Sequence, residues 1–116
     1  MGIGGVIMQD RFKFRFFETY DNTMLDCKDY DFEEILESGK PVMQCTGLKD
    51  KNGKLIYEGD ICEYEFEEIG KQKAIIEFNT KYATFLIKPL NDFQYANIND
   101  CEVIGNRYEN PELLED

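Results

Sequence analysis

Residues 61–68 alternate between apolar and acidic side chains, and this pattern constrains the fold more than any other feature of the sequence. The alternating positions are Cys62, Glu63, Tyr64, Glu65, Phe66 and Glu67. Successive side chains of a β-strand point to opposite faces of a sheet. The pattern therefore predicts a strand with one face buried in a core and the other face in water.

Two more strands are predicted directly after this one. Gly70 turns the chain into residues 74–78, and residues 79–81 turn it again into residues 82–88. In this last strand the alternation predicts that one face is shared by Ala83, Phe85 and Ile87. Three successive antiparallel strands form a meander, and small curled sheets of this kind tend toward barrels, which remove exposed edges.

The N-terminal part begins with a predicted hairpin. Phe12, Phe14 and Phe16 alternate with cationic residues, which predicts a strand with three aromatic side chains on one face. Residues 20–23 favour a turn, because their side chains bond the local backbone, and they return the chain into residues 24–27.

A short helix is predicted near residues 31–38. Phe32, Ile35 and Leu36 recur at helical spacing, and acids crowd the first turn, where the helix dipole favours them. Gly39, followed by Pro41, ends the helix.

The middle of the chain predicts another pair of strands. Residues 42–48 lead to Asn52-Gly53, a pair that readily takes the positive φ values of a tight hairpin turn, and residues 54–57 follow as a short strand. The sequence Glu58-Gly59-Asp60 then breaks the extended run.

The C-terminal part predicts a loop over residues 91–100 and a last strand over 101–108, with a bulge or tight bend at Gly105. Asn110 is expected to cap a short helical turn that begins at Pro111.

These elements predict a mainly β fold, at the margin of the α+β class, built on a small antiparallel barrel-like sheet. A chain of 116 residues is near the size of one domain. We expect a loose leader over residues 1–7 and one domain over 8–116. Within it, residues 8–40 form the hairpin and helix, and residues 41–116 form the β-rich portion.

Charge and cysteine content narrow the classes of function. The net charge of −11 opposes binding to nucleic acid and to anionic lipid, and no run of 18 apolar residues is present to span a membrane. The four cysteines contain no C-x-x-C pair, and the chain has no histidine, so a zinc site is not expected. We predict reduced thiols in the cytoplasm, with Cys62 and Cys101 in the core.

Three stretches, taken in order, carry a resemblance to a known family. They are residues 12–15 (FKFR), 43–61 (MQCTGLKDKNGKLIYEGDI) and 103–114 (VIGNRYENPELL). In this order and spacing the chain resembles the YopX family of small bacteriophage and prophage proteins. The resemblance implies a mainly β fold and a phage or prophage origin within a bacterial host cell. It implies no catalytic residue, because the family has no established activity.

Two carboxylate motifs suggest metal binding but fit a structural role better. Residues 50–53 (DKNG) begin like a calcium loop, yet Gly53 comes too early and Ile61 stands where a bidentate glutamate is needed, so a plain turn is favoured. The cluster of Glu58, Asp60 and Glu63 would suit a carboxylate-metal nuclease. We favour a loop in which Gly59 takes a special backbone angle and the Asp60 carboxylate ties the loop down.

The candidate interaction face is the acidic row of Glu63, Glu65, Glu67 and Glu68. Alternate strand positions repeat every ~6.6–6.8 Å, close to the phosphate step of DNA, so the row would permit mimicry of a nucleic acid. A solvated outer face explains the same residues without a partner. The few cations, Lys13 and Arg15 beside Phe17 and the pair Lys71 and Lys73, are expected to pair with carboxylates of this chain.

The sequence predicts a non-enzymatic, cytoplasmic protein-interaction module without catalytic residues, cofactor or metal. A homo-oligomer joined through sheet edges or an aromatic face is also expected, because sixteen Phe and Tyr residues exceed what a small core hides. The alternatives are an acidic inhibitor of a host nucleic-acid enzyme and a carboxylate-metal nuclease.

Overall fold

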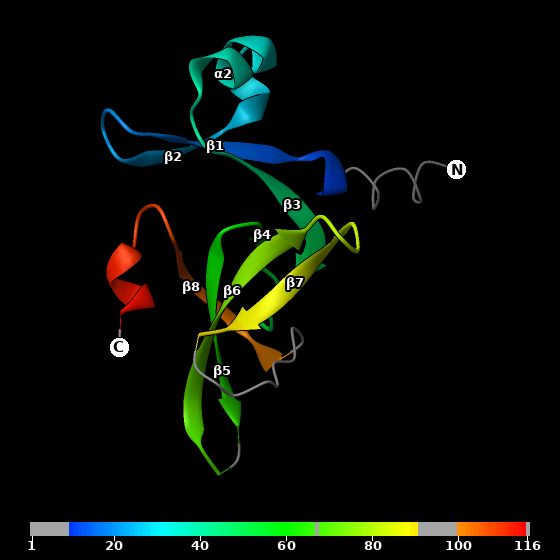
Figure 1. Cartoon of the computed structure of the whole chain (residues 1–116), viewed down its shortest axis with the longest axis vertical. Coiled ribbons are helices and arrows are strands. Elements are labelled where there is room, and N and C mark those ends of the chain that lie inside the picture. Colours follow the sequence, from blue (N-terminus) through cyan, green and yellow to red (C-terminus); the bar gives the residue numbers. More distant parts are fainter. Residues whose placement is uncertain (1–9, 67, 91–99, 116) are drawn as a thin grey trace.

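The protein is built from two four-stranded antiparallel sheets, shown by a computed structural model that describes residues 10–66, 68–90 and 100–115 (Figure 1). The first sheet has the order β2-β1-β3-β4, with the bounds Thr23–Asp26, Phe14–Glu18, Val42–Lys49 and Leu55–Tyr57. The second has the order β7-β6-β5-β8, with the bounds Thr84–Pro89, Gly70–Asn79, Asp60–Phe66 and Glu102–Asn106. The mainly β prediction is confirmed. The predicted leader and residues 91–99 of the predicted loop lie outside the described residues.

Short helical segments complete the chain. They are the 3₁₀ turns η1 (Asp10–Phe12), η2 (Cys27–Asp29) and η4 (Pro111–Leu114), and the helix α2 (Phe32–Ser38). The predicted helix is therefore confirmed, as is the C-terminal helical turn. The Asp31 carboxylate caps α2 by accepting the N–H groups of Glu33 and Glu34, and Gly39 ends it with a φ of 77°.

The first sheet carries α2 on one face. The small core between them consists of Phe16, Cys27 and Ile35, with Phe14, Leu25 and Val42 packed around it. The strands β3 and β4 also belong to this sheet, so the first sheet extends to Tyr57.

The prediction of a single aromatic face on the first strand was partly wrong. Phe12 lies in η1, before β1 begins, and it is 67% exposed, because the Lys13 N–H closes a turn onto the Asp10 carbonyl. Phe16 is buried on the α2 side of β1. Phe17 is also buried and stacks on Tyr108 at 5.4 Å, so β1 is covered on both faces.

The second sheet confirms the alternation of buried and exposed side chains predicted for residues 61–68. Cys62 and Tyr64 are buried, Glu65 is exposed and Glu63 is half-buried, while the side chains of Phe66 and Glu67 lie outside the described residues. Around Cys62 and Tyr64 the core also includes Ile56, Ala74, Ile76 and Cys101. The sheet ends on β7 and β8, so it forms a curled half-barrel with two edges (Figure 1).

The meander is confirmed, but its last strand is shorter than predicted. Phe85 and Ile87 share the face that packs on the core. Ala83 does not share it, because it lies in the preceding turn with a φ of 52°. The Asn79 side chain accepts the Tyr82 N–H and so extends this turn to Ala83.

The turn between β3 and β4 also differs from the prediction. Only Gly53 of the Asn-Gly pair takes a positive φ, 84°, and the Gly53 N–H donates to the Asp50 carbonyl. The Asp50 N–H in turn donates to the carbonyl of Lys54, which gives a wider loop than a two-residue hairpin turn.

Gly105 lets the C-terminal turn approach β8. A Cβ atom at Gly105 would lie 2.5 Å from Asn110 Oδ1 and 2.9 Å from Leu113 Cδ1. The prediction that Asn110 caps the turn was wrong, because its Oδ1 accepts the N–H of Asn106 and makes no capping bond. The Lys73 ammonium donates to the Leu113 carbonyl at 2.8 Å and holds the turn on the sheet.

We expect Gly105→Ala to lower the free energy of unfolding by about 1–3 kcal/mol, because the added methyl group overlaps two side chains. Urea unfolding of the two proteins measures the difference. Adding Leu113→Ala removes one of the overlapping groups, so the double variant should lose less than the sum of the single losses. Strictly additive losses would show that the two side chains do not meet.

Candidate functional site

A buried ion pair joins the two sheets. Arg15 on β1 donates through Nη2 to Asp60 Oδ1 on β5 at 2.6 Å, and their side chains are only 14% and 2% exposed. Asp60 Oδ2 accepts the Tyr57 N–H at 2.8 Å, and the Arg15 guanidinium lies 4.5 Å from the centre of the Tyr57 ring. Both carboxylate oxygens of Asp60 therefore have partners within the chain.

The structural interpretation of the Glu58-Gly59-Asp60 break is confirmed. Gly59 takes a φ of 88°, and the Asp60 carboxylate ties the loop to β1 and β4. Burial raises the pKa of the Asp60 carboxyl, against the opposing pull of Arg15 and of the Tyr57 N–H. In the part of the chain that the structure describes, no group of three or more acidic or cysteine side chains is arranged to hold a metal ion.

The Asp50 carboxylate makes a second connection between the sheets. It also confirms the predicted turn at residues 50–53, the calcium-like motif. Its Oδ1 accepts the N–H groups of Asn52 and Lys54, and its Oδ2 accepts the Val103 N–H of β8. Burial alone would raise the pKa of Asp50, but the three backbone donors together hold it below its usual range.

The acidic row is interleaved with cations. Across β5 and β6, Glu63 faces Lys73 and Glu65 faces Lys71, and the Lys71 ammonium lies 3.7 Å from a Glu63 carboxylate oxygen. Glu68 is exposed in the turn beyond β5, and Glu67 lies outside the described residues. The outer face is thus a mixed-charge ladder, which supports the interpretation of these glutamates as a solvated face rather than as a phosphate mimic.

The predicted pairings of the basic strip are confirmed, because Lys13 pairs with Asp10 at 3.0 Å and Arg15 pairs with Asp60. The prediction for Lys73 was wrong, because its ammonium donates to the Leu113 carbonyl at 2.8 Å and not to a carboxylate.

An aromatic groove beside the N-terminal hairpin is the best candidate for a binding site. Its volume is about 760 Å³, whereas two other hollows measure about 230 and 260 Å³. We call it the hairpin groove, and its lining residues are Phe12, Lys13, Phe14, Asp26, Cys27, Lys28, Phe32, Leu55 and Tyr57. Pockets of this size and apolar character commonly bind ligands.

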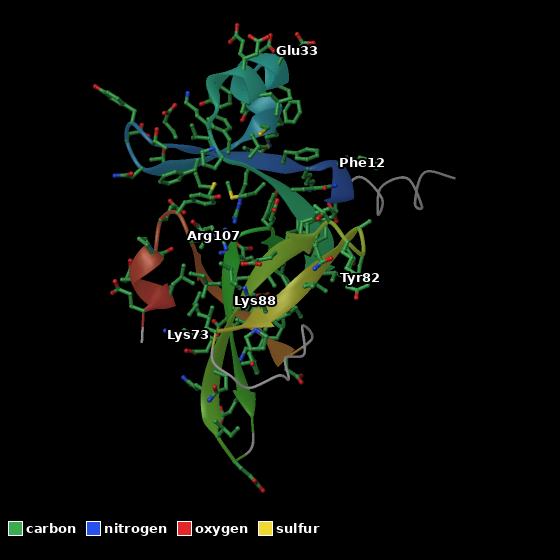
Figure 2. All side chains as sticks on the ribbon, in the orientation of Figure 1. Phe12, Glu33, Lys73, Tyr82, Lys88 and Arg107 are labelled. Carbon is green, nitrogen blue, oxygen red and sulfur yellow. The ribbon has the colours of Figure 1, made fainter. Side chains whose placement is uncertain are left out.

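The elements around the hairpin groove fix its aromatic walls. The rings of Phe14 on β1 and Phe32 on α2 are 5.4 Å apart, and Phe12 lies at the open N-terminal end of β1 (Figure 2). Tyr57 on β4 forms another wall while its ring contacts Arg15, so the ion pair between the sheets also positions the groove. Burial raises the pKa of Tyr57 to about 12, which keeps its phenol neutral.

The polar groups of the hairpin groove are few. Asp26 Oδ1 accepts the Lys28 N–H at 2.9 Å, and Lys13 and Lys28 are the other charged residues that line the groove. Burial raises the pKa of the Cys27 thiol, so Cys27 is protonated and is a poor nucleophile at neutral pH.

The sequence does not predict this groove. The aromatic residues of the first strand are evident in the sequence, but no pattern in it indicates that Leu55 and Tyr57 of β4 line the same groove as Phe32. The described members of the acidic row, Glu63, Glu65 and Glu68, lie on β5 and in the β5–β6 turn, which lies at the opposite end of the molecule from α2 (Figure 1).

The sequence and the overall fold are similar to those of known proteins. The model of the YopX family, described as YopX protein, matches residues 17–115, so the chain belongs to this family. The crystal structure of protein EF1440 from Enterococcus faecalis is similar, with 26% sequence identity and a TM-score of 0.63. The match covers 89% of this chain and 97% of that one. None of the curated proteins matches significantly.

Of the helices in the described ranges, none has the length and apolar character needed to cross a membrane.

We expect Asp50→Asn to lower the free energy of unfolding by about 1–3 kcal/mol at neutral pH. An amide can still accept from Asn52 and Lys54, but its NH₂ group would then face the Val103 N–H. Because the folded-state pKa of Asp50 is lowered, its stabilisation is complete above about pH 4 and is lost as the pH falls through the folded-state pKa.

Urea unfolding of wild type and variant between neutral and acidic pH measures this effect, and the gap between them should narrow below about pH 4. The exposed Asp29 provides the control, since Asp29→Asn should change the stability by less than about 0.5 kcal/mol. A gap for Asp50→Asn that does not depend on pH would contradict the role of its charge.

Proposed function

We propose that this YopX protein is a non-enzymatic protein-interaction module that binds a segment of another protein chain in the hairpin groove. The observation that carries the proposal is the exposure of aromatic side chains around a groove of about 760 Å³. Phe12 is 67% exposed and Phe32 is 38% exposed, although the protein has cores that bury aromatic residues elsewhere. A bound apolar side chain would remove this surface from water.

The arrangement of the acidic side chains supports binding rather than catalysis. Asp50 of the calcium-like motif and Asp60 of the nuclease-like cluster both accept hydrogen bonds that join the sheets. Metal-assisted hydrolysis needs oxygen ligands that are open to the metal and the substrate. In the hairpin groove, the carboxylate of Asp26 accepts a backbone N–H and the phenol of Tyr57 is neutral.

The proposal includes a phage or prophage origin and action in the cytoplasm of a bacterial host. Its support is the family membership together with the cysteines. None of the four forms a disulfide, and all are buried. Cysteines that are not joined in disulfides are typical of proteins in reducing compartments.

The test is affinity capture from bacterial cells with three versions of the full chain. Phe12→Ala removes the most exposed aromatic side chain of the groove. Tyr82→Ala is a matched control, because Tyr82 is 66% exposed, lies in the β6–β7 turn (Figure 2) and is not among the residues that line the groove. We expect a protein captured by the wild type to be retained by Tyr82→Ala and reduced at least about tenfold by Phe12→Ala.

Equal capture by Phe12→Ala and the wild type would contradict binding in the hairpin groove. Mg²⁺-dependent cleavage of nucleic acid by the purified wild type, lost on addition of a chelator, would contradict the non-enzymatic part of the proposal.

A further inference from the structure

Two of the buried cysteines, Cys62 and Cys101, lie together in the core of the second sheet. Cys62 is on β5, Cys101 directly precedes β8, and both side chains belong to the same hydrophobic cluster. In the ladder between these strands Cys62 lies opposite Val103. Val103 packs against this cluster, and Cys101 comes two residues before it, so the two cysteine side chains are diagonal neighbours on one face of the sheet.

The two thiols form a hydrogen bond in which Cys62 donates to the sulfur of Cys101. This bond raises the pKa of Cys62 and lowers the pKa of Cys101, although burial opposes ionisation of Cys101. For Cys27 and Cys45, in contrast, burial raises the pKa of the thiol. Cys101 is therefore the cysteine that most readily forms a thiolate, which is the form that reacts with oxidants.

The segment that carries Cys101 is also a point where the two sheets are joined. The Cys101 carbonyl accepts the Lys51 N–H of the β3–β4 loop at 3.0 Å, and the Asp50 carboxylate accepts the Val103 N–H. Within its sheet β8 is an edge strand that pairs with β5 alone. Opening of this edge exposes Cys101 to solvent at a lower cost than unfolding the whole sheet.

We propose that Cys62 and Cys101 are a redox-sensitive pair, which hydrogen peroxide oxidises to a disulfide and a dithiol reduces again. The disulfide fixes β8 to β5 at the place where the first sheet is attached. Cys101 lies before the first residue of β8, so its backbone can adjust to the geometry of a disulfide without breaking the β5–β8 ladder. Neither cysteine lines the hairpin groove, so this inference goes beyond the proposed function.

The oxidation has two steps. The Cys101 thiolate attacks one oxygen of the peroxide, the O–O bond breaks, and the departing hydroxide takes up the proton that the thiol lost. The Cys62 sulfur then attacks the sulfur of the resulting sulfenic acid, the S–O bond breaks, and the hydroxyl group leaves as water with the Cys62 proton. The two electrons that the sulfurs lose reduce one peroxide to two waters. A dithiol returns the two electrons by thiol–disulfide exchange.

The test is oxidation of the reduced, folded full chain with hydrogen peroxide at neutral pH. The remaining thiols are then alkylated in denaturant and counted by mass spectrometry, and a protease digest without reductant identifies linked peptides. Of the four thiols we expect two to be lost, with Cys62 and Cys101 in the linked peptides. Dithiothreitol should restore all four.

Two variants separate this pair from the other cysteines. Cys45→Ala is a matched control, because Cys45 is buried as completely as Cys62 but lies on β3, and this variant should form the same disulfide. Cys101→Ala should form none. Circular dichroism checks that each variant is folded, and the linked peptides of the wild type test the pair even if a variant does not fold.

Urea unfolding measures the effect on the fold. The disulfide closes the chain between residues 62 and 101, which restricts the unfolded state. We therefore expect oxidation to lower the equilibrium constant of unfolding of the wild type at least about tenfold, and to have no such effect on Cys101→Ala.

Four alkylatable thiols after the treatment with peroxide would overturn the proposal. A disulfide that joins other cysteines or two chains would also overturn it. The same holds for a link between Cys62 and Cys101 that forms only in denatured protein, since the sulfurs would then be out of reach in the folded chain. Binding in the hairpin groove is tested separately, by the capture with Phe12→Ala.

Discussion

The ion pair between Arg15 and Asp60 is the constraint on which the rest of the molecule depends. It joins the middle of β1 in one sheet to the start of β5 in the other, and both side chains are largely buried. Taking two charges out of water costs several kcal/mol per ion, and their attraction offsets this cost only when geometry and additional hydrogen bonds are good. Here the Tyr57 N–H and ring supply further contacts, although Arg15 Nε has no hydrogen-bond partner among the described residues. Such a pair fixes how the sheets meet more than it adds to net stability.

Asp50 makes the same kind of connection at a second place. Its carboxylate accepts the Val103 N–H of β8, and the neighbouring Lys51 N–H donates to the Cys101 carbonyl. The loop between β3 and β4 is therefore fixed to the second sheet. Together the two aspartates hold β4, the edge strand of the first sheet, against the core of the second sheet, and β4 carries Tyr57 into the wall of the hairpin groove. The candidate binding site is thus built on the connection between the sheets.

The sequence predicted the strands and the helix that are determined by residues close together in the chain. The alternation at Cys62 and Tyr64 predicted which side of β5 is buried, and Asp31 and Gly39 set the ends of α2. The structural role of Asp60 was also predictable, because a carboxylate after a glycine in a loop often binds the backbone.

The features that the sequence did not predict depend on packing between residues far apart in the chain. Phe17 is buried because it stacks on Tyr108, which follows in the chain only after both sheets are complete. The acidic row gains its lysines from β6, and the hairpin groove combines residues from β1, η2, α2 and β4. Periodicity within one segment does not indicate such neighbours, so the sequence predicts the acidic row as an interaction face and does not predict the groove.

The most direct test of the central claim is a double-mutant cycle on the ion pair, with Arg15→Met, Asp60→Asn and the chain that carries both changes. Urea unfolding measures the free energy of each. If the pair joins the sheets as described, each single change leaves a buried partner uncompensated and costs about 3–5 kcal/mol, while the double change costs clearly less than the sum. Losses that add to within about 0.5 kcal/mol would show that the two side chains act independently, and the account would be wrong.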